Sequence, residues 1–224
     1  MQKLMKVWDQ VKKKPKQTKN EAGRTASLFI YDAIYGDNWF GTSVSAKSVV
    51  KELEDVNAEQ LNVYINSPGG DVFEARAIAS GLRRLSQEKG IKTTAIIDGL
   101  CASAATYVAL ACDEVHMNIG CQFMIHQASG CCYGTKHDMR AYADLIEGIE
   151  NDIIADYVAK TGKPEDEVAE MLEAETWMST EEAFEHGFID LIVGKKAEEP
   201  EEPKDVRNSV GVLNANRLKL LLAQ

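Results

Sequence analysis

The chain has 224 residues, of which 45% are hydrophobic and 27% are charged, and its formal net charge at pH 7 is −10. This composition is typical of a soluble globular protein and excludes a disordered or collagen-like chain. No apolar run approaches about 18 residues, the length that a membrane-spanning helix needs. No apolar stretch follows the basic residues 1–6, so we expect no secretory signal, no membrane partner and a cytoplasmic protein.

The charge is unevenly distributed along the chain. Residues 1–24 carry eight Lys or Arg residues against Asp9 and Glu21, a net charge of +6, so the remaining 200 residues carry −16. Such a basic arm could contact nucleic acid or an acidic partner, or it could be a solvated chain end. Because the rest of the chain is acidic, nucleic-acid binding is not expected as the main function.

The cysteines give no indication of a metal site. The five residues are Cys101, Cys112, Cys121, Cys131 and Cys132, and their spacing matches no zinc-binding pattern. In a cytoplasmic protein we expect them to be reduced and to act as small apolar side chains. We therefore expect no metal and no cofactor.

Predicted strands and helices alternate along the chain. Apolar, β-prone runs predict strands at 28–31, 61–65, 93–97 and 114–117, and the patterns at 46–53 and 72–85 predict helices. This alternation favours an α/β fold with largely parallel strands. A helix is also predicted at 136–160, where apolar residues recur every three or four positions from Met139 to Tyr157. Since about 25 helical residues span about 37 Å, we expect this helix to extend toward another subunit.

Three regions are expected along the chain. Residues 1–25 are predicted to form a basic N-terminal arm, and residues 26–194 to form the compact domain. Residues 195–224 begin with a stretch rich in charge and proline, which predicts a linker. Leucines at 212–222 then predict a short amphipathic helix that could pack on the domain or bind a partner.

Three segments carry residue types that suit catalysis. The first is Asn66-Ser67-Pro68-Gly69-Gly70-Asp71, between a predicted strand and a predicted helix. Paired glycines allow positive φ and a close approach of the backbone, so this turn could present amide N–H groups to an anion. Taken alone, the segment is equally compatible with a tight turn that binds nothing.

The second and third segments supply a hydroxyl and an imidazole. Ser103 lies among small residues between a predicted strand and an apolar run, where it could be a nucleophile or simply a helix N-cap. His126 ends the apolar run Met124-Ile125-His126-Gln127 and could be a base or a structural histidine. A serine hydroxyl needs such a base, because alone it is a weak nucleophile.

Together, in this order and at roughly this spacing, the three segments resemble the ClpP family of serine proteases. The likeness continues in Lys-Thr-Gly at 160–162, in Met-Ser-Thr-Glu-Glu-Ala at 178–183 and in Gly-Phe-Ile-Asp at 187–190. The resemblance implies a serine endopeptidase in which Ser103 is the nucleophile and His126 the general base.

The resemblance also indicates the acid and the oxyanion hole. The family has an Asp four positions before the Ser of the 178–183 motif, and the corresponding residue here is Glu175. A Glu can still orient the imidazole, although its side chain is one methylene longer, and Glu173 is a nearby alternative. The family pattern assigns the oxyanion hole to the backbone N–H groups of Gly70 and Ala104.

The family fold implied by the resemblance is a repeated ββα spiral, shared with the crotonase superfamily, with a protruding helical handle at 136–160. The implied partners are further copies of the chain, in a heptameric ring or a double ring that encloses the active sites, and polypeptide substrates. Residues 32–53 differ from the usual ClpP N-terminus and are more similar to phage and prophage ClpP-like proteases, which are linked to head maturation and cut scaffold or capsid proteins. This departure puts dependence on an AAA+ unfoldase in doubt.

Three other functions share parts of this pattern. An inactive ring subunit would have lost Ser103 or His126, and a crotonase-type acyl-CoA enzyme would not need both. A Ser–Lys peptidase of the signal-peptide-peptidase type shares the fold, but it would use a lysine base in place of His126.

Overall fold

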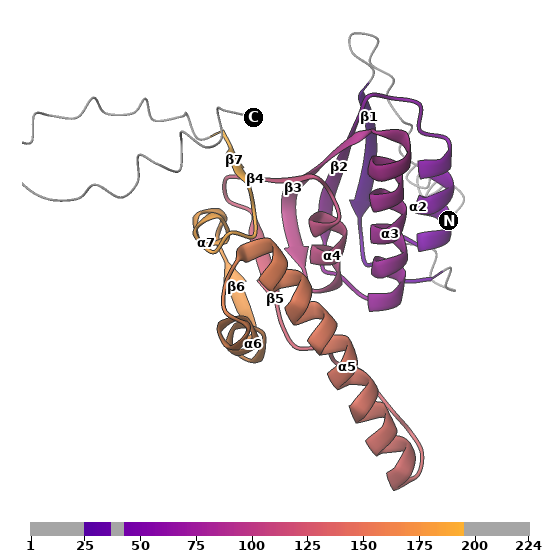
Figure 1. Cartoon of the computed structure of the whole chain (residues 1–224), viewed down its shortest axis with the longest axis vertical. Helices are drawn as coiled ribbons and strands as arrows, with labels where there is room; N and C mark the ends of the chain where they lie inside the picture. Colours follow the sequence, from indigo (N-terminus) through magenta and orange to yellow (C-terminus); the bar gives the residue numbers. More distant parts are fainter. Residues whose placement is uncertain (1–24, 37–42, 195–224) are drawn as a thin grey trace, which may run out of the picture. The chain divides into compact units, whose positions relative to one another are not determined.

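A mostly parallel β-sheet forms the framework of the protein (Figure 1). The structure is a computed structural model that describes residues 25–36 and 43–194. The predicted arm (apart from Thr25), linker and C-terminal amphipathic helix lie outside the described residues, and these domain assignments stay predictions. The strands are β1 (Thr25–Tyr31), β2 (Gln60–Ser67), β3 (Lys92–Ala102), β4 (Glu114–Asn118), β5 (Gln122–Ile125), β6 (Thr176–Met178) and β7 (Leu191–Val193).

The strand order positions the ends of β3 and β5 side by side. The main path of the sheet runs β1-β2-β3-β4-β7, and all of its pairs are parallel. Strand β3 has 11 residues, so its first half pairs with β4 and its second half pairs with β5. Strand β5 then pairs on its other side with β6, in antiparallel orientation.

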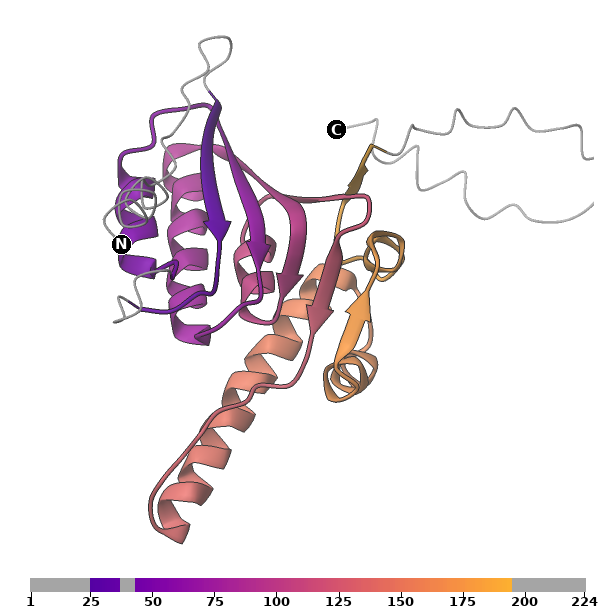
Figure 2. The ribbon, with the colours of Figure 1, turned by 180° about the vertical axis from the view of Figure 1, so that it is seen from behind.

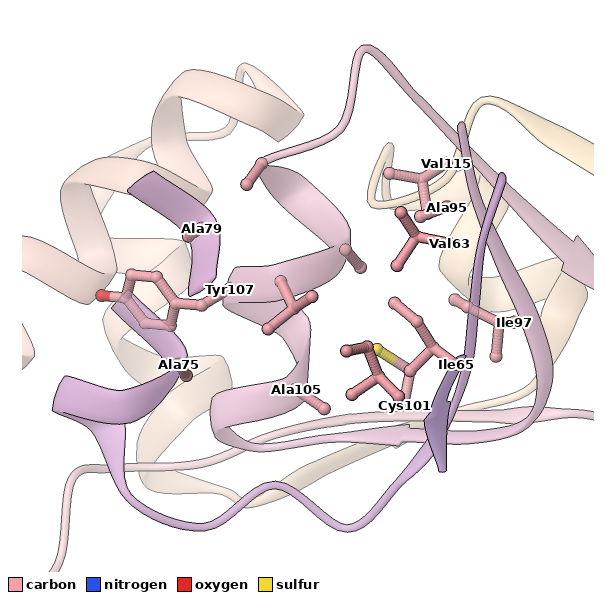
Figure 3. Packing of buried hydrophobic residues seen from close by; sticks show 14 of the residues in the cluster. Val63, Ile65, Ala75, Ala79, Ala95, Ile97, Cys101, Ala105, Tyr107 and Val115 are labelled. Atoms are coloured by element: carbon pink, nitrogen blue, oxygen red, sulfur yellow. The ribbon is translucent and has the colours of Figure 1, made fainter. Parts of the chain in front are cut away.

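Helices cover one face of the main sheet. These are α2 (Ala46–Glu54), α3 (Val72–Lys89) and α4 (Ala104–Leu110), which lie on the same side of β1, β2 and β3 in both views (Figures 1 and 2). Every second residue of β2 is buried against them, including Val63 and Ile65. Buried small residues allow close packing between the elements, and Figure 3 shows Ala75 and Ala79 of α3 beside Tyr107 of α4.

The long helix α5 (Lys136–Thr161) extends well past the end of the sheet (Figure 2). It begins with a capping box between Thr135 and Asp138 and ends at Gly162, whose φ of 71° suits a left-handed cap. Its C-terminal half is buried through Ile149, Ile153 and Tyr157, whereas Met139 and Leu145 in its N-terminal half are each 51% exposed. One half of the helix therefore packs on its own domain and the other half presents an apolar surface.

The predicted strands and helices are all confirmed, with boundaries within a few residues. The sequence analysis did not predict β5, β6, β7, α6 (Glu165–Glu173) or α7 (Thr180–Glu185). These elements have three to nine residues, too few for a periodic pattern to be recognised. Among the described residues, no helix is long and apolar enough to cross a membrane.

Candidate active site

Ser103 occupies a strained position between β3 and α4. Its backbone has φ 53° and ψ −128°, and its N–H donates to the carbonyl of Met124 at 2.9 Å. A non-glycine residue in such a conformation costs about 1–3 kcal/mol and persists only where the surroundings impose it. The neighbours Ala102, Ala104 and Ala105 are all buried and small. Although Ser103 is the N-cap of α4, it makes no side-chain cap bond to that helix.

His126 lies next to Ser103 because β3 and β5 are paired. Ala102 is opposite Met124 in the parallel register, so the residues that follow both strands emerge on the same edge of the sheet. The Ser103 hydroxyl and Nε2 of His126 are 2.7 Å apart. The structure therefore brings together the expected nucleophile and the expected base, within the range of a catalytic hydrogen bond.

The turn with two glycines lies against Ser103. Gly69 has φ 87°, and a Cβ at this position would be 2.8 Å from Cβ of Ser103 and 2.5 Å from the carbonyl oxygen of Ala102. Gly70 has φ 144°, and a Cβ there would be 2.1 Å from the carbonyl oxygen of Ile34. Both positions therefore require glycine, for conformation as well as for space.

The N–H of Gly70 is directed away from Ile34. Ile34 accepts a hydrogen bond from the N–H of Asp71 and donates one to the carbonyl of Gly69, both at 2.8 Å. In extended chain, successive peptide groups point to opposite sides, so the N–H of Gly70 points away from Ile34. Gly70 lines the same pocket as Ser103, Ala104 and His126.

Side-chain hydrogen bonds stabilise the turn at 66–71 and connect it to the segment that precedes Ser103. Asn66 accepts from the backbone N–H of Leu100 at 3.1 Å, and Ser67 accepts from the N–H of Gly69 at 3.1 Å. Asp71 caps α3 by accepting from the N–H groups of Phe73 and Glu74. The polar residues of this turn thus fix its backbone, and the N–H groups of Gly69 and Asp71 are bonded within the protein.

Glu175 directly precedes β6, the strand that pairs with β5, but its carboxylate is hydrogen-bonded to a residue other than His126. Ile125 pairs with Thr176 in the antiparallel register of β5 and β6, so His126 and Glu175 are the next residues beyond that pair. The exposed Glu175 carboxylate accepts a hydrogen bond from Nε1 of Trp177 at 3.2 Å. Among the described residues, no hydrogen bond joins Glu175 to His126.

Two other carboxylates near the end of the chain are poorer candidates for the acid. Asp190 accepts from the backbone N–H of Val115 and from Lys160, each at 2.7 Å, so it joins β4 to α5. Glu173 is exposed in the last turn of α6. Of the three, Glu175 alone directly precedes the strand that pairs with β5.

Hydrogen bonds beneath Ser103 connect it to α5. The Thr106 hydroxyl donates to the carbonyl of Ser103 at 2.6 Å, and the hydroxyl of Tyr157 lies 2.7 Å from the same Thr106 oxygen. Since the carbonyl can only accept, Thr106 is the donor there and Tyr157 donates to Thr106. Burial raises the pKa of Tyr157, which keeps the phenol neutral and able to donate. The buried Cys101, two positions from Ser103, likewise has a pKa raised by burial and is an unreactive thiol.

A pocket of about 540 Å³ opens beside Ser103 and His126. Its lining includes Tyr35 after β1, Phe73 at the start of α3, Met124 of β5, and Tyr142, Ile146 and Ile149 of α5. The sequence analysis did not identify these side chains as pocket residues. The apolar stripe of α5 was visible, but only the tertiary structure reveals that part of it faces the pocket. Among the described residues, no cluster of His, Cys, Asp or Glu could hold a metal ion.

Comparison with known proteins identifies the family. The family model described as Clp protease matches residues 13–196. The chain belongs to the Clp protease family. It is a serine-type endopeptidase of this family, as the resemblance of its motifs predicts.

Named relatives and a solved structure agree with this assignment. The chain is 30% identical over 161 residues to ATP-dependent Clp protease proteolytic subunit 1 of Prochlorococcus marinus (strain MIT 9312). This alignment covers 69% of the chain and 80% of the relative. It is 31% identical over 166 residues to the ATP-dependent Clp protease proteolytic subunit of Leuconostoc citreum (strain KM20). This alignment covers 71% of the chain and 79% of the relative. A ClpP1 mutant from Listeria monocytogenes has a similar structure, with a TM-score of 0.63 and 22% identity over 76% of this chain and 92% of that chain.

The predicted Clp fold class is thus confirmed. The comparisons do not favour the crotonase-type enzyme or the inactive ring subunit. The closer likeness to phage and prophage proteases is not tested by these matches and stays a prediction.

Proposed function

We propose that this Clp-family chain cleaves peptide bonds with Ser103 as nucleophile and His126 as general base. The observation that carries the proposal is the 2.7 Å separation between the Ser103 hydroxyl and Nε2 of His126. His126 takes the hydroxyl proton as the oxygen attacks the peptide carbonyl, and it returns the proton to the leaving amine. Water then hydrolyses the acyl-enzyme in a second step of the same kind.

We assign the third role to Glu175. An acid must accept a hydrogen bond from Nδ1–H of His126, so that the imidazole keeps the correct tautomer and its charged form is stabilised. The strand register supports Glu175, because it is next to the pair formed by Ile125 and Thr176. Its backbone also supports a functional role. Glu175 has φ 49° at the position after α6 where glycine is usual, so a longer side chain is retained there despite strain.

The oxyanion hole is formed, in this proposal, by the backbone N–H groups of Gly70 and Ala104. Gly70 directs its N–H away from Ile34, and Ala104 is the first residue of α4, whose N–H has no acceptor within that helix. Both residues line the pocket that contains Ser103. Two such donors stabilise the negative charge that develops on the carbonyl oxygen of the substrate.

The proposed substrates are unfolded polypeptides or scaffold and capsid-type proteins, cleaved inside a cytoplasmic assembly of several copies. The exposed apolar residue Met139, in the half of α5 that extends past the sheet, supports an assembly in which a second copy covers it. We propose a heptameric ring or a pair of rings. Both curated relatives described above are named ATP-dependent subunits. These names support an AAA+ unfoldase as a further partner.

Peptidase activity on short fluorogenic peptides and on unfolded casein, without ATP or any partner, tests this function. Ser103→Ala should abolish cleavage and Glu175→Gln should reduce it, with the mass of the oligomer measured by light scattering. Ring-sized particles that lose activity with Ser103→Ala would support a compartmentalised serine protease. Activity that survives Ser103→Ala would refute the assignment of the nucleophile, and a monomer would refute the chamber.

A further inference from the structure

The side chains of the β5–β6 ribbon alternate between its two faces. Met124 is opposite Trp177 in the antiparallel register, and opposed side chains in such a pair lie on the same face. Met124 lines the pocket that contains Ser103. Thr176 points to the other side, where its hydroxyl donates to the carbonyl of Met171 at 2.6 Å. Trp177 therefore belongs to the face of the ribbon that borders the active site.

The side chain of Glu175, the residue just before β6, meets that of Trp177 through a hydrogen bond. Nε1 of Trp177 donates to Oε1 of Glu175 at 3.2 Å. A carboxylate has two oxygens that can each accept hydrogen bonds, so this contact leaves Oε2 available for a second donor. His126 uses Nε2 for Ser103, and its Nδ1 is the ring nitrogen that an acid must hold.

We propose that Trp177 is a positioning residue, whose indole N–H orients the Glu175 carboxylate for contact with His126. The inference rests on the triad assigned under the proposed function. A Glu side chain has one more rotatable bond than an Asp, so a carboxylate at this position needs an additional restraint to keep one orientation. Trp177 supplies that restraint from the adjacent strand. It acts through Glu175 and does not itself touch the reacting atoms.

The exposure of Trp177 argues against a purely structural role. Trp177 is 51% exposed, and its indole N–H donates to a carboxylate that is itself exposed. Removing one polar atom from such a residue should leave the core of the domain intact. A matched control is Tyr133→Phe, because Tyr133 is a fully exposed aromatic residue that also loses one polar group.

A double-mutant cycle with Glu175 tests the proposal. Trp177→Phe keeps an aromatic ring and removes the N–H, so kcat should fall roughly ten-fold while KM stays unchanged, as expected for loss of one hydrogen bond to a charged group. The same substitution in a Glu175→Gln background should cause little further loss. Tyr133→Phe should leave kcat unchanged.

Several outcomes would overturn the role of Trp177. An increase in KM at constant kcat would make Trp177 a substrate contact, and an equal fall of kcat in both backgrounds would make its effect independent of Glu175. No change at all would remove it from the mechanism. As a second readout, the indole ¹H–¹⁵N resonance of Trp177 should shift in Glu175→Gln, which is independent of turnover; an unshifted resonance would contradict the contact.

The two proposals fail in different ways. If Ser103→Ala keeps its activity, the proposed function is wrong. If Ser103→Ala is inactive and Glu175→Gln is impaired, while Trp177→Phe behaves as wild type, the triad survives and only the role of Trp177 is refuted.

Discussion

The hydroxyl of Tyr157 lies 2.7 Å from the hydroxyl of Thr106, and through Thr106 it is linked to the carbonyl of Ser103. Tyr157 is in the buried half of α5, so the helix that extends from the domain is joined by two hydrogen bonds to the proposed nucleophile. The ring of Tyr157 also packs edge-on against Phe188, with centroids 5.5 Å apart. The polar contact can therefore be removed without removing the packing.

Tyr157→Phe should separate these two contributions. The ring contact with Phe188 is retained, while Thr106 loses its donor, so the free energy of unfolding should fall by about 1 kcal/mol. Thr106→Val removes the bond to the carbonyl of Ser103 as well, and we expect a larger loss of kcat from this variant than from Tyr157→Phe. Thermal unfolding and steady-state peptidase assays measure both effects. Equal kcat values in the two variants would show that the bond to the Ser103 carbonyl does not position the nucleophile.

Gly70→Ala should inactivate the enzyme although glycine has no side chain to lose. The new Cβ would lie 2.1 Å from the carbonyl oxygen of Ile34, so the backbone must shift and carry the N–H out of position. Loss of one oxyanion donor typically lowers kcat by about 10²–10³-fold. The measurement is kcat of the purified oligomer on a fluorogenic peptide.

Gly90→Ala is the control for Gly70→Ala. Gly90 also has a positive φ, 64°, but a Cβ there meets nothing within 4 Å, and the residue caps the C-terminal end of α3, the opposite end from Asp71. It should lose stability through backbone strain and keep its kcat. A Gly70→Ala protein with normal kcat would exclude its N–H from the oxyanion hole.

Glu175→Gly should make the domain more stable and less active. Glu175 has φ 49°, a left-handed conformation that costs a non-glycine residue about 1–2 kcal/mol and glycine little. Because glycine also makes the unfolded chain more flexible, we expect a net gain of about 0.5–1 kcal/mol in the free energy of unfolding. Chemical denaturation and kcat, measured on the same preparation, test this exchange of stability for activity. If stability rises and kcat is unaffected, Glu175 is not the acid.

The sequence predicted the elements with a long hydrophobic pattern and the residues that belong to catalytic motifs. The strands at 61–65 and 93–97 were predictable because apolar and β-branched residues dominate them, and α5 because its stripe covers several turns. Ser103 and His126 were predictable from their motifs, but their separation depends on the pairing of β3 with β5. A strand of four residues such as β5 leaves no periodic pattern from which that pairing could be derived.

The contact between Glu175 and Trp177 could not be predicted from the sequence either. It depends on the alternation of side chains along β6, a strand of three residues, and on the positive φ of Glu175. The contribution of α5 to the pocket wall could not be predicted either, because it depends on the tertiary structure. The length of the predicted helix indicated a contact with another subunit, whereas the middle part of its apolar stripe, including Ile146 and Ile149, lines the pocket. An apolar stripe indicates that a surface is buried or covered, not what covers it.

Asp113 should make the stability of the domain depend on pH at the acidic end. Partial burial of its carboxyl group opposes ionisation, but hydrogen bonds from the backbone and hydroxyl of Thr93 and from Ser86 outweigh this and lower its pKa. A pKa that is lower in the folded state than in the unfolded chain, about 3.9, adds stability above that value. This stability is lost as the pH falls through the folded-state pKa. We expect Asp113→Asn to unfold more easily than wild type at pH 7, by about 0.5–1 kcal/mol, because solvent screens this exposed carboxylate.

The difference between Asp113→Asn and wild type should shrink below about pH 4, since the carboxyl of the wild-type protein then becomes protonated as well. Asp144→Asn, a change of an exposed carboxylate on α5, is the control and should follow the wild-type curve at every pH. Urea denaturation between pH 3 and pH 8 gives the required free energies, provided that all proteins are compared at the same oligomer concentration. A difference that stays constant across this range would mean that Asp113 acts through packing and not through its charge, because only an ionised carboxylate gains stability from its donors in a pH-dependent way.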